Sequence, residues 1–188
     1  MKNLILRFSG ALLMLTGVLQ PVLAAVNLDR TRIIYNASDK SVSVMLENQS
    51  KDLPYLAQVW LENAQGEKIT SPLVALPPMQ RIDAGQKSQI RILQLPEAAA
   101  LPKDRESLFY FNVREVPPKS EMANVMQVAI QSRVKLFFRP AELRKLIKGN
   151  WQEQLQISRL NDGLKLTNPT PFYITVGYLG KDNKGNVP

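Results

Sequence analysis

The sequence of 188 residues contains no cysteine and no histidine. Without cysteine no disulfide can stabilise the fold, so stability has to come from a packed core. Without histidine there is no imidazole for acid–base catalysis, and the common metal sites that use histidine are excluded. The sequence also has no glycine-rich phosphate-binding loop and no nucleophile elbow. We therefore expect neither an enzyme nor a bound cofactor or metal.

Long apolar runs are missing after the start of the chain. Residues 1–24 begin with Lys2 and Arg7, continue with an apolar run over 8–19, and end in Val-Leu-Ala, which supplies the small residue that a signal peptidase needs. This pattern predicts a signal peptide over 1–24 and a mature chain that begins at Ala25. No later stretch approaches the about 18–20 apolar residues that a membrane span needs. The sequence thus predicts an exported, soluble protein without membrane insertion.

The charge of the chain is unbalanced, with 24 Lys and Arg against 16 Asp and Glu and a formal net charge of +8. A basic excess is typical of proteins that bind nucleic acid, anionic membranes or acidic partners, but solubility explains it equally well. The basic residues are scattered, and exported proteins rarely meet nucleic acid. We therefore expect no nucleic-acid partner.

The mature chain alternates segments rich in β-branched and aromatic residues with turn clusters at 36–39, 63–66, 83–85 and 117–120. Seven short strands with frequent turns predict an immunoglobulin-like β-sandwich. No helix longer than one or two turns is expected, and residues 96–102 are the best position for one. The segments that read as strands are 26–35, 42–48, 53–62, 73–76, 88–93, 107–115 and 124–139.

The character of the chain changes after Pro140. Residues 141–150 are charged and weakly patterned, which indicates a linker, and 155–160, 164–167 and 172–179 read as three further strands. An immunoglobulin-like domain usually takes about 100 residues, so this region is an incomplete second domain or is completed by something else. The expected fold is all-β, with an N-terminal immunoglobulin-like domain over 25–143 and a partial second one over 144–188.

The segment 124–139 alternates with period two and places Met126, Val128 and Ile130 on one side. Such side chains usually face the core of their own domain. Val125 and Ala129, however, make the other side partly apolar. Two interpretations follow: either these side chains belong to the core of their own domain, or the strand buries one face and offers the other to a guest.

Three charged positions also have two interpretations. Arg32 and Lys135 are either ordinary surface residues or, if they meet in a cleft, a binding site for a carboxylate. Glu106 is either a catalytic carboxylate, which would need a second carboxylate nearby, or a member of a structural ion pair. Spacing in the sequence does not decide between them.

Six blocks of the mature chain resemble, in the same order, the periplasmic chaperones of pilus and fimbria assembly, the PapD-like family. Together they extend over essentially the whole mature chain, and six matches in register are far more specific than any single one. The blocks are residues 25–32, 53–58, 77–81, 105–117, 134–140 and 168–173.

The resemblance implies two immunoglobulin-like domains arranged as a boomerang, with a cleft that holds a pilus subunit in the periplasm. The subunit is an incomplete sandwich, and the chaperone completes it with its own seventh strand, a β-augmentation called donor-strand complementation. By position, Met126, Val128 and Ile130 resemble the side chains that enter the subunit. Arg32 and Lys135 resemble the two cations that bind its C-terminal carboxylate.

The resemblance implies further sites and partners. Glu106 and Arg139 resemble two members of an interdomain salt bridge, whose third, acidic member would lie beyond Pro188. The short loop over 116–123 resembles the short-loop branch of the family. A second copy of the chain is a further expected partner, in a homodimer in which the two copies cap each other. The family also has a surface that docks on the outer-membrane usher. The residues of this chain that resemble it are Leu56, Gln58, Pro77 and Pro78.

Two points remain open in the sequence. Lys135 is five residues from Ile130, so a regular strand directs them to opposite faces, and we expect a bulge or sharp twist between Gln131 and Val134, or a change of cleft wall. The alternative function is an exported β-sandwich adhesin or binding module whose apolar strand is simply core. If the chaperone interpretation holds, Met126, Val128 and Ile130 are exposed in the free monomer.

Overall fold

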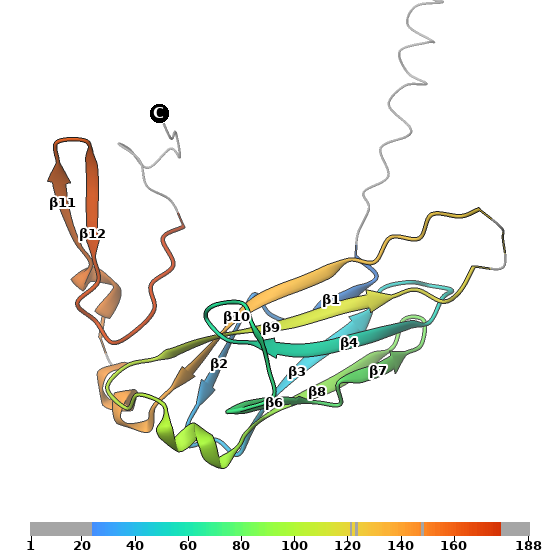
Figure 1. The fold of residues 1–188 in the computed structure, drawn as a ribbon, viewed down its shortest axis with the longest axis horizontal. Helices are drawn as coiled ribbons and strands as arrows, with labels where there is room; N and C mark the ends of the chain where they lie inside the picture. Colours follow the sequence, from blue (N-terminus) through green and yellow to red (C-terminus); the bar gives the residue numbers. More distant parts are fainter. Residues whose placement is uncertain (1–23, 121, 123, 148, 178–188) are drawn as a thin grey trace, which may run out of the picture.

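The computed structural model describes residues 24–120, 122, 124–147 and 149–177, so the predicted signal peptide lies outside the described residues except for Ala24. The N-terminal part is a sandwich of two sheets (Figure 1). One sheet has the order β1 (Val26–Leu28), β3 (Ser41–Asn48), β8 (Lys87–Gln94), β6 (Leu73–Leu76). The other has the order β2 (Arg32–Asn36), β10 (Gln131–Arg139), β9 (Ser107–Val116), β4 (Tyr55–Glu62), β5 (Lys68–Ile69), with β7 (Met79–Ile82) also paired with β4. The predicted all-β, immunoglobulin-like class is confirmed.

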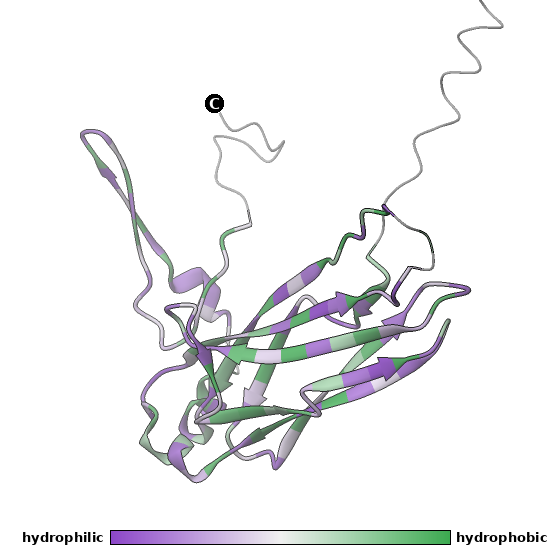
Figure 2. Ribbon diagram, turned by 45° about the vertical axis from the view of Figure 1, so that its right-hand side comes forward, coloured by the Kyte–Doolittle hydropathy of each residue, from purple (hydrophilic) through white to green (hydrophobic). Residues whose placement is uncertain are grey.

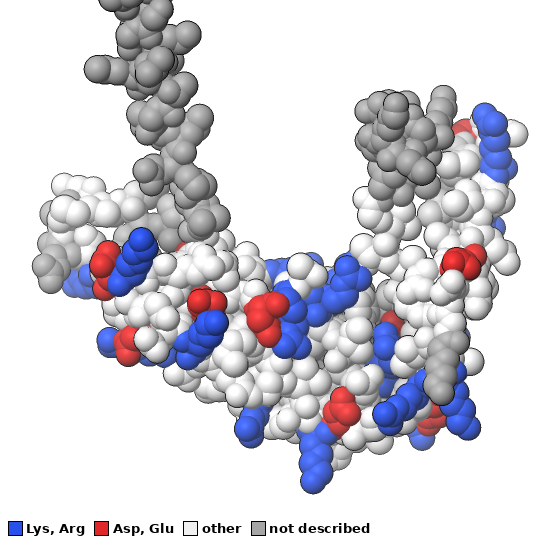
Figure 3. Space-filling view, turned by 180° about the vertical axis from the view of Figure 1, so that it is seen from behind, with Lys and Arg blue, Asp and Glu red and all other residues white. Residues whose placement is uncertain are grey.

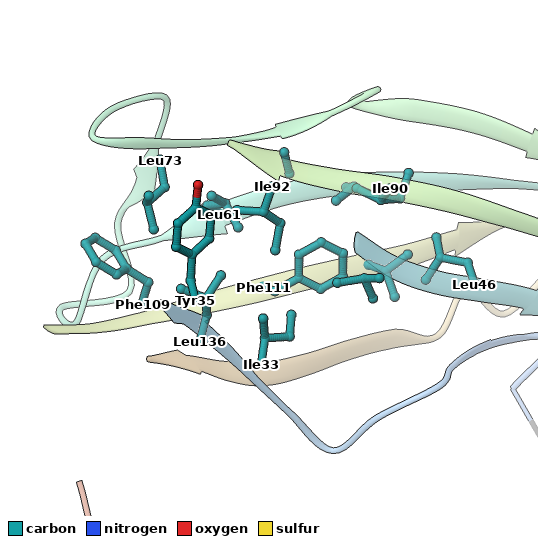
Figure 4. Close-up of a cluster of buried hydrophobic side chains, with 14 of the residues drawn as sticks. Ile33, Tyr35, Leu46, Leu61, Leu73, Ile90, Ile92, Phe109, Phe111 and Leu136 are labelled. Atoms are coloured by element: carbon teal, nitrogen blue, oxygen red, sulfur yellow. The ribbon is translucent and has the colours of Figure 1, made fainter. Parts of the chain in front are cut away.

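The core lies between the two sheets, because alternate side chains of each strand point inward. Along β4, Ala57, Val59 and Leu61 are buried, whereas the side chains between them are not. Figure 2 shows the same alternation as hydropathy that changes from residue to residue along the strands. Figure 4 shows the side chains that meet in the middle, including Ile33, Tyr35, Phe111 and Leu136 from one sheet and Leu46, Ile90 and Ile92 from the other.

The first predicted strand, 26–35, is wrong as a single element. It divides at Asp29 into β1, which pairs antiparallel with β3, and β2, which pairs parallel with β10 in the other sheet. The chain changes sheets at polar residues: Asp29 binds Arg30 at 2.6 Å, and its amide donates to Met45 O at 3.2 Å. The guanidinium of Arg30 lowers the pKa of the Asp29 carboxyl through this hydrogen bond. The crossing brings the start of β2 beside β10.

The predicted helical turn near 96–102 is present as the 3-10 helix η1 (Pro96–Ala100). The strands β5 and β7 were not predicted. β5 has only two residues, and β7 has a single buried side chain, Ile82, and therefore no apolar alternation.

The region after Pro140 differs more from the prediction. The expected linker contains the 3-10 helix η2 (Ala141–Ile147), followed by η3 (Trp151–Gln154). The strands β11 (Gln156–Leu160) and β12 (Gly163–Thr167) form a hairpin whose residues are all exposed, and it stands away from the sandwich in Figure 1. The predicted third strand is wrong for 172–177, which form no regular element, and its last residues lie outside the described part. None of the described helices has the length and apolarity to cross a membrane.

One buried amide joins three parts of the sandwich. Asn48, at the end of β3, is completely buried, and its Nδ2 donates to Leu53 O at 2.9 Å and Ile82 O at 3.0 Å. Its Oδ1 accepts a hydrogen bond from Ser50 N at 3.0 Å. The side chain therefore fixes the turn after β3 to the end of β7.

We expect Asn48→Ala to lower the free energy of unfolding by about 1–3 kcal/mol, because it leaves buried carbonyl groups without a donor. Urea denaturation followed by circular dichroism measures the change. The control is Asn63→Ala, which removes hydrogen bonds that water can replace, and it should cost less than about 1 kcal/mol. Equal losses in the two variants would contradict the role of Asn48.

Candidate functional site: an open strand edge that ends at two cations

The central feature of the site is the unequal pairing of β10. On one side it pairs antiparallel with β9 over residues 131–138. On the other side it pairs parallel with β2 only from Lys135 to Arg139, because β2 begins at Arg32. Within the part of the chain that the structure describes, residues 131–134 have no strand on that side. Their backbone N–H and C=O groups form an open edge to which another strand can be added.

The apolar segment before β10 is not a strand in this structure. The predicted strand over 124–139 is therefore wrong in its first half, since regular pairing begins only at Gln131. A backbone hydrogen bond from Glu115 N to Ile130 O, at 3.0 Å, holds the end of the segment. Met126 is 89% exposed and Val128 is 66% exposed, as expected for a free monomer. The prediction is wrong for Ile130, which is half-buried because it directly precedes the paired part of β10.

The expected bulge between Gln131 and Val134 is absent. Residues 131–138 pair one to one with β9, without a skipped position. Val134 and Leu136 accordingly point toward the core, whereas Arg133 and Lys135 lie on the exposed face. If the segment before β10 continued it regularly, Met126, Val128 and Ile130 would lie on the core side, beyond the end of the sandwich. Opposite faces for Ile130 and Lys135 thus follow from a regular strand.

The two cations named from the sequence meet at the end of the open edge. Lys135 is directly opposite Arg32 in the parallel pair, so both side chains lie on the outer face of neighbouring strands, about 4.8 Å apart at the backbone. Both residues are exposed, and neither has an ion-pair partner among the described residues. Arg30, in contrast, is paired with Asp29. Two positive charges are therefore available to one anion at this point.

Two residues after Lys135, the outer face of β10 is covered by the segment that follows β12. Phe137 lies on the outer face but is buried, because Tyr173 stacks on it with 5.4 Å between ring centroids. Arg139 lies over the ring of Phe172 at 5.3 Å. The segment after β12 therefore borders the two cations on one side and leaves the open edge accessible on the other.

A buried ion pair holds this segment in place. Arg139 Nε donates to Glu106 Oε1 at 2.7 Å, and the side chains are 13% and 2% exposed. Glu106 Oε2 accepts a hydrogen bond from Tyr173 N at 2.8 Å, and Glu106 N donates to Pro171 O at 2.9 Å. Both carboxylate oxygens are engaged, so Glu106 has the contacts of a structural ion pair.

The four residues named for usher docking lie around β4 and the start of β7. Leu56 and Gln58 are on the outer side of β4, opposite Arg81 and Met79. Pro78 precedes β7, and its carbonyl accepts a hydrogen bond from Val59 N at 2.8 Å. Pro77 is half-buried and Pro78 exposed. These residues are separate from the open edge of β10.

A network on the outer face was not predicted. Arg133 Nε donates to Glu62 Oε2 at 2.9 Å, and its guanidinium carbon lies 3.5 Å from the centre of the Tyr110 ring. Trp60 Nε1 donates to Glu62 Oε1 at 2.9 Å. These residues come from β4, β9 and β10, and Glu62 and Arg133 are 71 positions apart. Only the strand register brings them together, so no local pattern could have revealed the network.

The charged side chains do not gather in one basic surface. Figure 3 shows basic and acidic atoms in small mixed groups on the face seen from behind. This distribution agrees with the scattered basic residues of the sequence.

The fold and the site together define a β-sandwich protein with an open edge strand, exposed apolar side chains next to that edge, and two neighbouring cations where the edge ends. The sequence model of the protein family described as pili and flagellar-assembly chaperone, PapD N-terminal domain, matches residues 25–144. The model of the pili assembly chaperone PapD, C-terminal domain, matches residues 150–187. The chain belongs to the PapD-like family of pilus assembly chaperones.

Relatives and solved structures agree with this assignment. The chaperone protein PapD of Escherichia coli is 50% identical over 162 residues, which cover 86% of this chain and 68% of the relative. The chaperone protein PmfD of Proteus mirabilis is 51% identical, with 90% and 66% covered. The Salmonella enterica SafB chaperone, solved in complex with the SafA pilin, matches with a TM-score of 0.73 and 30% identity over 84% of this chain and 74% of that chain.

We expect Glu106→Ala to release the segment that carries Tyr173, because the amide of Tyr173 loses its acceptor and Arg139 loses its carboxylate. Hydrogen exchange in a peptide that spans 171–177 should become at least about tenfold faster, equivalent to about 1.4 kcal/mol. The matched control is Asp104→Ala, which removes the neighbouring exposed pair with Arg105 and should leave the rate unchanged. Unchanged exchange in both variants would show that Glu106 does not hold this segment.

Proposed function

We propose that this chain acts in the periplasm as a chaperone that holds a pilus subunit by pairing a strand of the subunit with the open edge of β10 and the segment before it. The observation that carries the proposal is the position of Arg32 and Lys135 at the point where the open edge ends. A solved relative that binds a pilin supports a subunit as the guest. The proposal assigns the chain no catalysed reaction.

The geometry favours one orientation of the guest. β2 runs parallel to β10 and occupies its edge from Lys135 onward. A guest strand that runs in the same direction along residues 125–134 would point its C-terminus at the start of β2. Its terminal carboxylate would then reach Arg32 and Lys135, where charge-assisted hydrogen bonds can form. An antiparallel guest would instead direct its amino terminus toward two positive charges.

Magnitudes indicate why the cations matter. Burying side chains such as Met126, Val128 and Ile130 contributes about 1.5–3 kcal/mol each. Fixing the backbone of the unpaired segment costs about 1–2 kcal/mol per residue, and the new ladder hydrogen bonds offset only part of this at about 0.5–1.5 kcal/mol each. The balance is close to zero, so hydrogen bonds to charged groups, at about 1.5–3 kcal/mol each, decide whether the complex is stable.

The other named residues have supporting roles in this proposal. The Glu106–Arg139 pair keeps the segment with Tyr173 against the sandwich as an interdomain salt bridge. Leu56, Gln58, Pro77 and Pro78 form the surface that docks on the outer-membrane usher while the subunit is held elsewhere. Without a subunit, the same open edge and apolar segment would cap a second copy of the chain. The adhesin alternative is not favoured, because Met126 and Val128 are exposed and do not belong to the core.

We expect Lys135→Ala to weaken subunit capture about 10- to 150-fold, since one charge-assisted contact of about 1.5–3 kcal/mol is lost. The measurement is co-purification of a co-expressed pilus subunit, followed by titration of a peptide that carries the last strand of that subunit. Arg91→Ala removes an exposed cation from β8 in the other sheet and is the charge-matched control. Equal capture by Lys135→Ala and the parent chain would exclude the carboxylate anchor.

We expect Val128→Asp to prevent capture, because it places a charge among side chains that the subunit must bury. The same substitution at the neighbouring Gln127 should be tolerated, because alternate residues of a strand face opposite sides. Pull-down of the subunit compares the two variants. Similar loss in both would mean that the segment does not bind as a strand with one apolar side.

A further inference from the structure

The outer face of β10 offers a second cation to a guest carboxylate. Arg133 and Lys135 are two residues apart on this face. A guest strand that slips by two residues, about 6.6 Å, keeps every side chain on the same side. The apolar pattern of the guest therefore rejects a slip of one residue but not a slip of two. The cation that binds the carboxylate decides between these two registers.

The structure holds Arg133 away from the open edge. Its side chain crosses Tyr110 on β9 and reaches Glu62 on β4, at the far side of β9 from that edge. Its Nη2 extends to the turn after β4, where a Cβ on Gly66 would lie 3.6 Å from it. Arg133 is thus directed toward the middle of the sheet.

Glu62 is a firmly placed, charged partner. Its side chain is 13% exposed and accepts hydrogen bonds from both Trp60 and Arg133. Partial burial raises the pKa of this carboxyl, but these hydrogen bonds and the charge of Arg133 outweigh burial and lower the pKa overall. The carboxylate therefore stays ionised at neutral pH.

We propose that Glu62 is a register-determining residue: it neutralises Arg133 and draws it off the edge, so that the carboxylate of a guest strand binds at Lys135 and Arg32 and not two residues earlier. This inference rests on the proposed function. Tyr110 supports the same arrangement through its ring. The ion pair acts on where the guest binds and not on whether it binds.

Glu62→Gln tests the inference, because the amide keeps an acceptor for Trp60 but loses the charge that holds Arg133. The probe is a set of synthetic peptides of alternating valine and threonine with a free C-terminal carboxylate, each with one cysteine at a different position. Because the chain has no cysteine, Ser132→Cys supplies a single thiol beside the open edge. The peptide that forms a disulfide with this thiol, with dissolved oxygen as the oxidant, reports the register.

In the Ser132→Cys parent we expect a disulfide with only one peptide of the set, the one whose cysteine lies opposite position 132. Adding Glu62→Gln should produce a second disulfide, two positions nearer the C-terminus of the peptide. Adding Arg133→Ala as well should remove this second product, a rescue that a general loss of stability would not give. Glu67→Gln removes an exposed carboxylate near the turn after β4 and should keep the single product.

The outcomes separate the two proposals. A single, unchanged disulfide in the Glu62→Gln variant, with thermal unfolding like that of the parent, would overturn the register inference and leave the carboxylate anchor intact. If a peptide with an amidated C-terminus binds the parent as well as the free acid does, the anchor and the register inference both fail. A second disulfide that persists after Arg133→Ala would also overturn the role of Arg133.

Discussion

The parallel pairing of β2 with β10 is the contact on which the rest of this structure depends. Because the chain crosses between sheets near Asp29, β2 begins at Arg32 and covers β10 only from Lys135 onward. The same strand end leaves the preceding backbone of β10 open and places two cations where the opening stops. An uninterrupted first strand in one sheet would provide neither feature. The open edge and the two cations at its end thus have one structural cause, the position at which β2 begins.

From this point β10 divides into regions with different surroundings. Met126 and Val128, before the strand, have no core to enter and remain exposed. Lys135 lies in the paired part but on the open face. Phe137 and Arg139 lie on the same face and are covered by Tyr173 and Phe172. A guest therefore meets apolar side chains first, then charge, and then a closed surface that prevents it from going further.

Local patterns revealed the parts of this arrangement that depend on one strand at a time. Alternation in 42–48 and 107–115 identified β3 and β9 closely. It overstated the strand over 124–139, because an apolar alternation persists in the sequence whether or not a neighbouring strand is present to pair with it. The meeting of Arg32 with Lys135 came from family resemblance. The Glu62–Arg133 pair came from neither, since strands distant in sequence must first be placed side by side.

Period-two alternation has a general limit as a recognition signal. It states which side of a strand is apolar, but it repeats every two residues and so carries no information about position along the strand. Position has to be marked by something that does not repeat, and a terminal carboxylate is such a mark on the guest. On this chain the corresponding mark has to be unique as well. If Arg133 and Lys135 were both free to bind the carboxylate, the guest could bind in two registers. Pairing Arg133 with Glu62 leaves one position along the edge for the carboxylate.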